Sequence, residues 1–200
     1  MVTLFMLLAG AGLAVMTTYN TYIEDESTIS IEGIGLGVTA FATGMFIGAM
    51  LMGALGEYLP LLWVYLVNTA FYIAIIVGLI FVAPADSVGF YIFLGGIGAI
   101  NGGYEATQMR IGMEYSQGHI GGTLYNWYMS FSNIGTLALG PILISQLSDT
   151  LGGYQYSMQF ASLFLLLAVI PGIFIILWLK KEAITETPEK EENKLLSETE

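Results

Sequence analysis

The sequence contains no cysteine, one histidine and only 5 lysine or arginine residues. Without cysteine, the chain can form neither disulfides nor thiolate metal sites. The single histidine, His119, provides no histidine cluster for a metal ion. The formal net charge is −11, and an acidic chain does not suit nucleic acid, whose phosphates are neutralised by lysine and arginine. We therefore expect no metal, no cofactor and no nucleic-acid partner.

Charge of either sign is also scarce. Charged residues make up only 10% of the chain, hydrophobic residues make up 56%, and the mean hydropathy is +0.73. A water-soluble domain carries about 25% charged residues. Since this chain cannot cover its surface with charge, its solvent must be the lipid bilayer.

Long apolar runs dominate the sequence instead. A bilayer core about 30 Å thick requires about 20 mostly apolar residues in a helix. Six such stretches lie at about 2–22, 34–56, 60–83, 87–109, 121–147 and 155–179. In lipid, each backbone polar group must be hydrogen-bonded within its own segment, so these stretches should be helices. The sequence predicts an all-α membrane protein with six transmembrane helices in residues 1–181.

The few basic residues predict how these helices are oriented. Arg110 follows the fourth stretch, and Lys180 and Lys181 follow the sixth, whereas the loops on the other side carry acids but no lysine or arginine. Positive charge accumulates on the cytoplasmic side of membrane proteins. We therefore expect a multi-pass protein of the plasma (cytoplasmic) membrane with both termini in the cytoplasm. Residues 182–200 carry seven acids and two lysines, which favours a solvated, disordered cytoplasmic tail.

Small residues recur at a spacing that brings them onto one helix face. Gly44 and Gly48 lie four apart in the second stretch, and Gly98 and Gly102 lie four apart in the fourth. Stripes of this kind allow two membrane helices to approach closely. A Gly-Pro pair at 140–141 predicts a kink in the fifth stretch, because proline removes a helical hydrogen bond.

Two short segments carry a resemblance to a known family. Residues 53–60 read GALGEYLP, and residues 121–141 read GGTLYNWYMSFSNIGTLALGP. Together with six spans and both ends on one side, they resemble the C-terminal half of a major facilitator superfamily transporter. The cytoplasmic turn motif of that family runs Gly-x-Leu-Ala-Asp-Arg-x-Gly-Arg-Arg/Lys. Here Leu55 and Glu57 match or substitute conservatively, while Tyr58 stands where arginine is usual.

The resemblance implies a function as well as a fold. Transporters of this family consist of two six-helix halves, each made of two inverted three-helix repeats, which here would be residues 1–83 and 87–179. The expected function is secondary active or facilitative transport of a small solute by alternating access. A chain of one half would be a fragment, a partner in a split transporter or a homodimer, and the abrupt start of the first apolar stretch favours the first two.

Another class of function remains open from the sequence. A non-transporting membrane scaffold or sensor could have the same bundle and use the acidic tail to bind a partner. An enzyme is not expected, because no nucleophile–base pair, metal-ligand cluster or phosphate-binding motif stands in a catalytic context.

Three charged residues are candidates for coupling or for a structural lock. Glu105 precedes Arg110 by five residues, which places it about 7–8 Å further along the helix axis. An intramembrane carboxylate is by default a functional hypothesis, here a proton-coupling site. The alternative is a lock with Arg110 or with the turn that holds Glu57, and the shallow depth favours this lock. The resemblance implies that Glu57 stabilises the outward-facing shape through Arg110 or the start of the fifth span.

Neutral polar residues are candidates for the wall of a solute cavity. In the fifth stretch they recur at helical spacing and so share one face. In the resembled family the first and fourth spans of each half line the cavity. The candidates are Thr17, Asn20, Asn101, Tyr104, Asn126, Ser130 and Asn133. Interhelical hydrogen bonding is the alternative role for each. No lysine or arginine lies within a span, so a neutral or amphipathic solute fits better than an anion.

Overall fold

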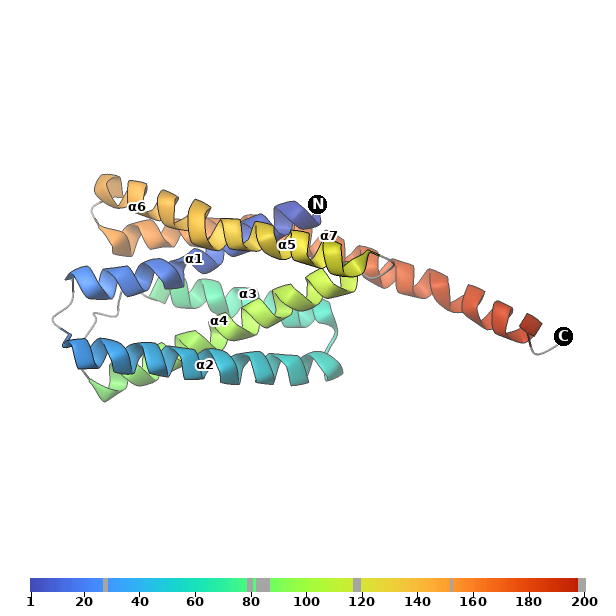
Figure 1. Cartoon of the computed structure of the whole chain (residues 1–200), viewed down its shortest axis with the longest axis horizontal. Coiled ribbons are helices and arrows are strands. Elements are labelled where there is room, and N and C mark those ends of the chain that lie inside the picture. The colour runs from blue at the N-terminus through green and yellow to red at the C-terminus, as the bar shows by residue number, and fades with distance from the viewer. Residues whose placement is uncertain (27–28, 79–80, 82–86, 117–119, 152, 198–200) are drawn as a thin grey trace.

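The computed structural model describes residues 1–26, 29–78, 81, 87–116, 120–151 and 153–197. These residues are almost entirely helical, and no strand occurs among them (Figure 1). In chain order the elements are α1 (Val2–Glu26), α2 (Ile31–Tyr58), α3 (Leu61–Gly78), α4 (Val88–Tyr115), α5 (Gly121–Ile134), the π-helical η2 (Gly135–Leu139), α6 (Gly140–Leu151) and α7 (Tyr154–Ser197).

Each of the six apolar stretches is mainly helical in its described residues, but only part of the six-span prediction is confirmed. Within the described residues, three helices are long and apolar enough to cross a membrane: Ile31–Tyr58, Leu61–Gly78 and Tyr156–Lys181. Residues Val2–Val15 form a shorter apolar helix. In α4, polar residues such as Asn101 and Glu105 lower the hydropathy, and the fifth stretch is divided by η2. The helical fold is thus confirmed, and three of the six expected spans are apolar enough to cross a membrane.

Local sequence signals explain where two of the helices begin and where one ends. Ser30 and Ser87 precede α2 and α4, and each serine hydroxyl accepts a hydrogen bond from the backbone N–H three residues later, at 3.1 and 3.3 Å. Such N-caps pair a backbone donor that the first helical turn leaves free. Helix α2 ends at Tyr58, just before Pro60, because the residue preceding a proline is disfavoured in the helical conformation.

The helices pack into one bundle with α2 and α4 at its lower side in Figure 1. Helix α2 packs along α4, whereas α1 packs against α7, α5 and η2. Helix α3 lies between α4 and α7 and contacts both. Because α4 contacts α2, α3 and α5, its side chains can face several different surroundings.

The small-residue stripes of α2 and α4 lie against each other, a pairing that the sequence did not specify. A Cβ atom added at Gly102 would lie 2.7 Å from the backbone carbonyl carbon of Met45, and one at Gly98 would lie 2.9 Å from that of Phe41. On the facing helix, a Cβ at Gly44 would lie 3.0 Å from the Ala99 nitrogen. The two backbones touch at these glycines, which is the packing that small-residue stripes permit in membranes.

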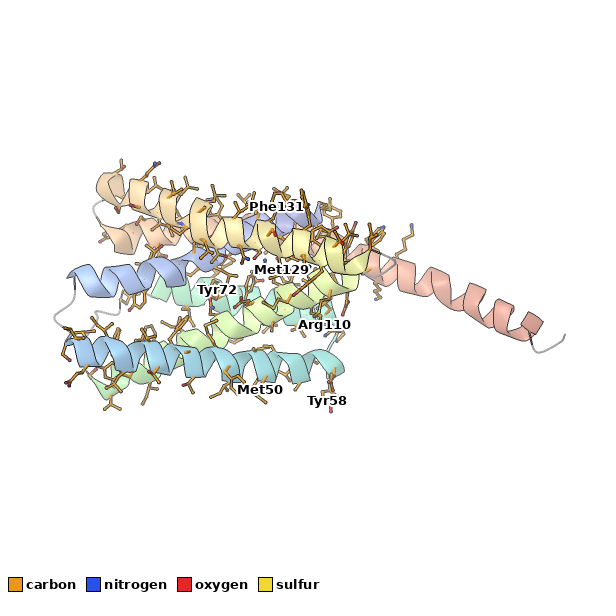
Figure 2. The ribbon with its side chains drawn as sticks, in the orientation of Figure 1. Met50, Tyr58, Tyr72, Arg110, Met129 and Phe131 are labelled. Atoms are coloured by element: carbon orange, nitrogen blue, oxygen red, sulfur yellow. The ribbon has the colours of Figure 1, made fainter. Side chains whose placement is uncertain are left out.

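Large apolar side chains cover the outside of the bundle. Met50 and Tyr58 on α2 point away from the other helices and are 61% and 81% exposed, whereas Tyr72 lies buried among them (Figure 2). Further exposed apolar residues, including Phe71 and Phe174, lie on α3 and α7. So large an apolar exterior is unfavourable in water and suits contact with lipid.

The C-terminal part of α7 differs from the expected disordered tail. Helix α7 continues to Ser197, so residues 182–197 are helical, and this part projects away from the bundle (Figure 1). The segment is rich in glutamate, lysine and leucine, which are good helix formers. A charged composition predicts solvation, but it does not by itself exclude a single helix.

The α2–α4 contact predicts a position-specific cost of adding one methyl group. Gly102→Ala should lower the free energy of unfolding by about 1–3 kcal/mol, because the new Cβ overlaps the Met45 backbone. Gly96→Ala on the same helix is the matched control, since no atom lies within 4 Å of its added Cβ. Unfolding in mixed detergent micelles measures both variants. Equal stability of the two would show that α2 and α4 are not in backbone contact at Gly102.

Candidate functional site

A cavity of about 350 Å³ lies where α1, α2, α4, α5 and η2 meet. It is lined by Leu13, Phe41, Met45, Asn101, Glu105, Met129, Ser132, Asn133, Thr136 and Leu137. Three residues proposed from the sequence, Asn101, Glu105 and Asn133, meet here from two helices. The remaining wall is mostly apolar, with two hydroxyl groups contributed by Ser132 and Thr136.

Helix geometry brings the two α4 residues to the cavity together. Asn101 and Glu105 are four residues apart and therefore project from neighbouring positions on one face. The Glu105 side chain is half-buried. Among the described lining residues, Glu105 is the one acid, and no lysine or arginine accompanies it. The cavity therefore offers a carboxylate beside neutral hydrogen-bonding groups, without a cation that would attract an anionic solute.

Asn101 connects the cavity to the buried interior. The Tyr72 hydroxyl on α3 donates a 2.7 Å hydrogen bond to Asn101 Oδ1. Both residues are buried, so this bond satisfies two polar groups that would be costly to leave unpaired. The bond from Tyr72 thus holds the Asn101 carboxamide in place at the cavity wall.

A second polar contact, between Gln108 and Ser132, was not identified from the sequence. Gln108 Nε2 donates to Ser132 Oγ at 2.9 Å and, at 3.5 Å, to the backbone oxygen of Met6. This bond connects α4 to α5 directly behind the cavity wall, and both side chains are buried. The spacing contained a usable signal, because Gln108 follows Asn101 by seven residues, or two helical turns.

The π-helical segment shapes the α5 side of the cavity. The Gly140 N–H donates to the Gly135 oxygen, five residues back, and Pro141 follows without an N–H of its own. A π-turn next to proline widens the helix and is a recognised cause of a kink. Thr136, inside this segment, donates at 3.0 Å to the backbone oxygen of Gly10 on α1. The predicted break near residues 140–141 thus takes the form of a π-turn anchored to α1.

Tyr104 lies in the core and is not among the residues that line the cavity. Its ring stacks on Tyr72, with centroids 5.4 Å apart and an interplanar angle of 14°. At about 100° per residue, Tyr104 points well away from its neighbour Glu105 and toward α3. Helix α4 lines this cavity through Asn101 and Glu105, and the face of the helix decides which of its residues reach it.

The remaining neutral candidates have different positions. Asn126 and Ser130 lie on an exposed face of α5, and Ser130 Oγ donates at 2.8 Å to the Asn126 backbone oxygen. They are not among the residues of the cavity wall. Thr17 and Asn20 belong to the second half of α1, where their side chains lie outside the described part of the structure.

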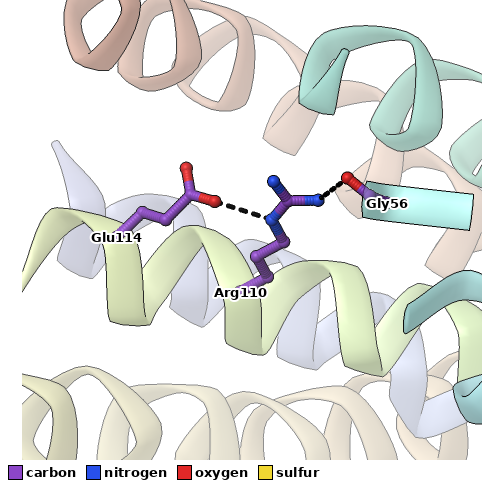
Figure 3. Close-up of polar contacts among 3 residues, drawn as sticks. All are labelled: Gly56, Arg110 and Glu114. Atoms are coloured by element: carbon purple, nitrogen blue, oxygen red, sulfur yellow. Dashed lines mark hydrogen bonds and ion pairs between the residues drawn. The ribbon is translucent and has the colours of Figure 1, made fainter. Parts of the chain in front are cut away.

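Arg110 ties the end of α4 to the end of α2 (Figure 3). Its Nε donates to Glu114 Oε1 at 2.6 Å, and its Nη1 donates to the backbone oxygen of Gly56 at 2.6 Å. The last carbonyls of a helix are unpaired and carry partial negative charge, so they attract a cation. Glycine gives the guanidinium room, because a Cβ at position 56 would lie 2.5 Å from Nη1.

The expected partners of Arg110 were Glu105 and Glu57, but the structure pairs Arg110 with Glu114. Residues five apart lie about 140° apart around a helix, so Glu105 and Arg110 point in different directions although they are close along the axis. Residues four apart, such as Arg110 and Glu114, share a face. Glu57 is exposed in the last turn of α2, where the Gly56 carbonyl takes the bond expected for the Glu57 carboxylate.

The two hydrogen bonds donated by Arg110 predict a local effect of replacing its guanidinium group with an ammonium group. In Arg110→Lys, a single ammonium group replaces the planar guanidinium group, which donates hydrogen bonds to two partners at once. Because the Arg110 and Glu114 side chains are 38% and 33% exposed, solvent weakens the ion pair, and we expect the loss to be about 1 kcal/mol. Backbone amides at the end of α2 should then exchange hydrogen about fivefold faster.

Glu114→Gln is the matched control for this measurement, since it removes the ion pair but keeps the bond from Arg110 to Gly56. Hydrogen exchange read by mass spectrometry should change less at residues 56–59 in this variant. Equal hydrogen exchange in the wild type and in Arg110→Lys would contradict the role of the bond from Arg110 to Gly56.

Comparison with known proteins places the chain in a family. A family model described as Major Facilitator Superfamily matches residues 1–199. None of the curated proteins matches the chain. The family match covers the segments 53–60 and 121–141 that carry the resemblance, and the 200-residue length fits half of a transporter of this family. The family consists of membrane transporters rather than enzymes. The chain is thus an integral membrane protein that belongs to the major facilitator superfamily.

Proposed function

We propose that this chain forms half of a transporter that moves a small solute by alternating access, in a secondary active or facilitative mode. The cavity lined by Asn101, Glu105 and Asn133 carries this proposal. Polar groups in lipid-embedded helices are costly, and they usually face a cavity or a neighbouring helix. Transporters of this kind bind their solute between packed helices near the middle of the membrane.

The composition of the cavity wall favours a class of solute. Glu105 is accompanied by carboxamide and hydroxyl groups, while Phe41, Met45 and Met129 supply apolar surface. An anionic solute would meet a carboxylate without a compensating cation. A neutral or amphipathic solute would find both hydrogen-bonding partners and apolar contact, and this class remains our proposal.

A second half is needed to complete the site. Asn126, Ser130 and Asn133 lie on an exposed face of α5. Such a polar face is unfavourable against lipid and suits a facing protein wall. The partner would be a second six-span half, contributed either by another copy of this chain or by a different chain. This proposal covers a homodimer, a split pair and a fragment of a longer transporter alike.

We infer that the less apolar helices also cross the membrane. The 28 residues of α4 extend about 42 Å at 1.5 Å per residue, which exceeds the hydrocarbon thickness of about 30 Å. The buried positions of Asn101, Thr107 and Gln108 shield their polar groups from lipid. The six spans would then form two three-helix repeats, within residues 1–83 and 87–179.

We call the end of the bundle that carries Arg110 and Lys180 the basic end. We propose that the protein lies in the plasma membrane and that the basic end faces the cytoplasm. At this end, the bond from Arg110 to Gly56 holds α4 to α2. We propose that this tie, with Glu57 beside it, stabilises one of the two conformations of the alternating-access cycle.

Glu105 is proposed to couple transport to protons. Its place in the cavity and the engagement of Arg110 by Glu114 favour this role over a lock between Glu105 and Arg110. A carboxylate within the cavity can bind a proton in one conformation and release it in the other, because its surroundings change with access.

Alternating access can be tested without knowing the solute. The chain has no native cysteine, so Asn133→Cys introduces a single thiol at the cavity wall. In cells that naturally make the chain, a membrane-impermeant maleimide should label this thiol from outside the cell and, in inside-out vesicles, from the cytoplasmic side. Phe174→Cys is the control, since its side chain is exposed on α7 outside the cavity and a thiol in lipid stays protonated and unreactive.

A scaffold or sensor would give a different result in this experiment. Labelling of Asn133→Cys from one side only, or no faster than Phe174→Cys, would argue for a static bundle and against transport.

The coupling role predicts a pH-sensitive conformational balance that depends on Glu105. In the Asn133→Cys background, the ratio of labelling from the two sides should change with pH, because protonation removes the charge of the carboxylate in the cavity. Glu105→Gln should abolish that change because glutamine cannot bind or release the proton. Glu32→Gln, which alters an exposed acid in the first turn of α2, should retain it. An unchanged pH response in Glu105→Gln would overturn the coupling proposal.

A further inference from the structure

A second hollow, of about 500 Å³, lies at the basic end between the start of α3 and α7. It is lined by Pro60, Leu61, Leu62, Trp63, Glu114, Ile176, Leu177, Leu179 and Lys180, which we call the α3–α7 groove. The groove shares no residue with the polar cavity described above. Its wall is apolar apart from Glu114 and Lys180. Its volume is that of a ligand site, and its lining indicates a ligand with a long apolar part.

Aromatic residues indicate the depth of the groove in the membrane. Trp63 lines the groove and is 62% exposed, and Trp178, on the same stretch of α7, is 42% exposed. The Trp178 ring contacts Tyr115 at the end of α4, with centroids 5.0 Å apart. Tryptophan and tyrosine gather where hydrocarbon meets lipid headgroups. The groove therefore opens at the headgroup level of one leaflet, while its leucine and isoleucine side chains lie toward the hydrocarbon.

Lys180 contributes a positive charge at the mouth of the groove. The acid in the groove lining, Glu114, is paired with Arg110 at 2.6 Å. Lys180 is exposed and takes no part in that pair, and Lys181 follows it. Lysine and arginine are rare in this chain, and all three within residues 1–181 lie at this end of the bundle. Among the described side chains that line the groove, the charge of Lys180 is therefore the one left without an ion pair.

We propose that the α3–α7 groove is a binding site for an anionic phospholipid of the leaflet at the basic end. An acyl chain would lie along Leu61, Ile176 and Leu177, and the Lys180 ammonium would contact the headgroup phosphate. Trp63 would pack beside the glycerol region. A phospholipid combines the apolar length and the anionic head that this lining complements, and it is present at this depth in the surrounding membrane. The proposal requires membrane insertion alone and is independent of transport.

The test uses the full chain purified in mild detergent and native mass spectrometry. Phosphatidylglycerol and phosphatidylcholine with identical acyl chains are titrated separately, and inorganic phosphate is added as a soluble competitor. We expect one phosphatidylglycerol to bind more tightly than phosphatidylcholine and to resist inorganic phosphate, because the acyl chain supplies part of the affinity.

Two substitutions separate the polar and apolar contributions. Lys180→Gln should weaken phosphatidylglycerol binding about fivefold, the effect of one lysine at a membrane surface, and leave phosphatidylcholine binding unchanged. Lys190→Gln, on the projecting part of α7, is the charge-matched control and should have no effect. Trp63→Leu should weaken both lipids, whereas Trp127→Leu, on α5 and 57% exposed, should weaken neither.

Several results would overturn the proposal. Equal binding of the two lipids would mean that the groove does not select an anion. Equal loss in Lys180→Gln and Lys190→Gln would indicate diffuse attraction to the negative lipid rather than a site. Displacement by inorganic phosphate alone would indicate a soluble anion as the occupant. A dimer that dissociates in Trp63→Leu would assign the groove to a second copy of the chain.

Discussion

The backbone contact between α2 and α4 is the constraint on which the rest of the structure depends. Glycines at positions 44, 98 and 102 bring the two helices together, and in lipid this packing takes the place of a hydrophobic driving force. Once α4 is fixed against α2, the surroundings of its other faces are determined. One side packs on α3 through Tyr104, and another opens on the cavity through Glu105. A looser α2–α4 pair would leave the rotation of α4 undefined, and with it the position of every polar group on that helix.

Several polar side chains around the cavity bond to a neighbouring helix. Tyr72 bonds Asn101, Gln108 bonds Ser132, and the Thr136 hydroxyl reaches the α1 backbone. These bonds connect α3, α4, α5, η2 and α1 around the same space. Each is modest in energy, about 1 kcal/mol or less in a membrane bundle. Their combined effect is to fix the cavity wall, so that the groups that line it keep a defined direction.

The sequence predicted the helices and the small-residue stripes because both depend on local periodicity, but it did not specify that the stripes of α2 and α4 meet. Asn101, Glu105 and Asn133 were proposed because a polar residue in an apolar stretch stands out without knowledge of the fold, and all three line the cavity. The failures arise from rotation about the helix axis. Tyr104 is adjacent to Glu105 yet faces the core, and Arg110 pairs with Glu114 rather than with Glu105. Distance along the helix axis does not by itself decide which side chains meet. The angle around the axis, about 100° per residue, decides it. The π-turn before Pro141 could not be predicted from the sequence, because it depends on packing against α1.

The two glutamates of α4 illustrate why such angles matter for function. Glu105 and Glu114 are nine residues apart, which at about 100° per residue places them on opposite faces of one helix. Glu114 pairs with Arg110 near the end of α4, and Lys180 is the other charged residue that lines the α3–α7 groove. Glu105 lies in the cavity with no cation among its described lining residues. Since an unpaired carboxylate in an apolar wall is costly, it persists where binding a proton or a solute compensates for it. The same residue type therefore serves structure on one face of α4 and is available for chemistry on the other.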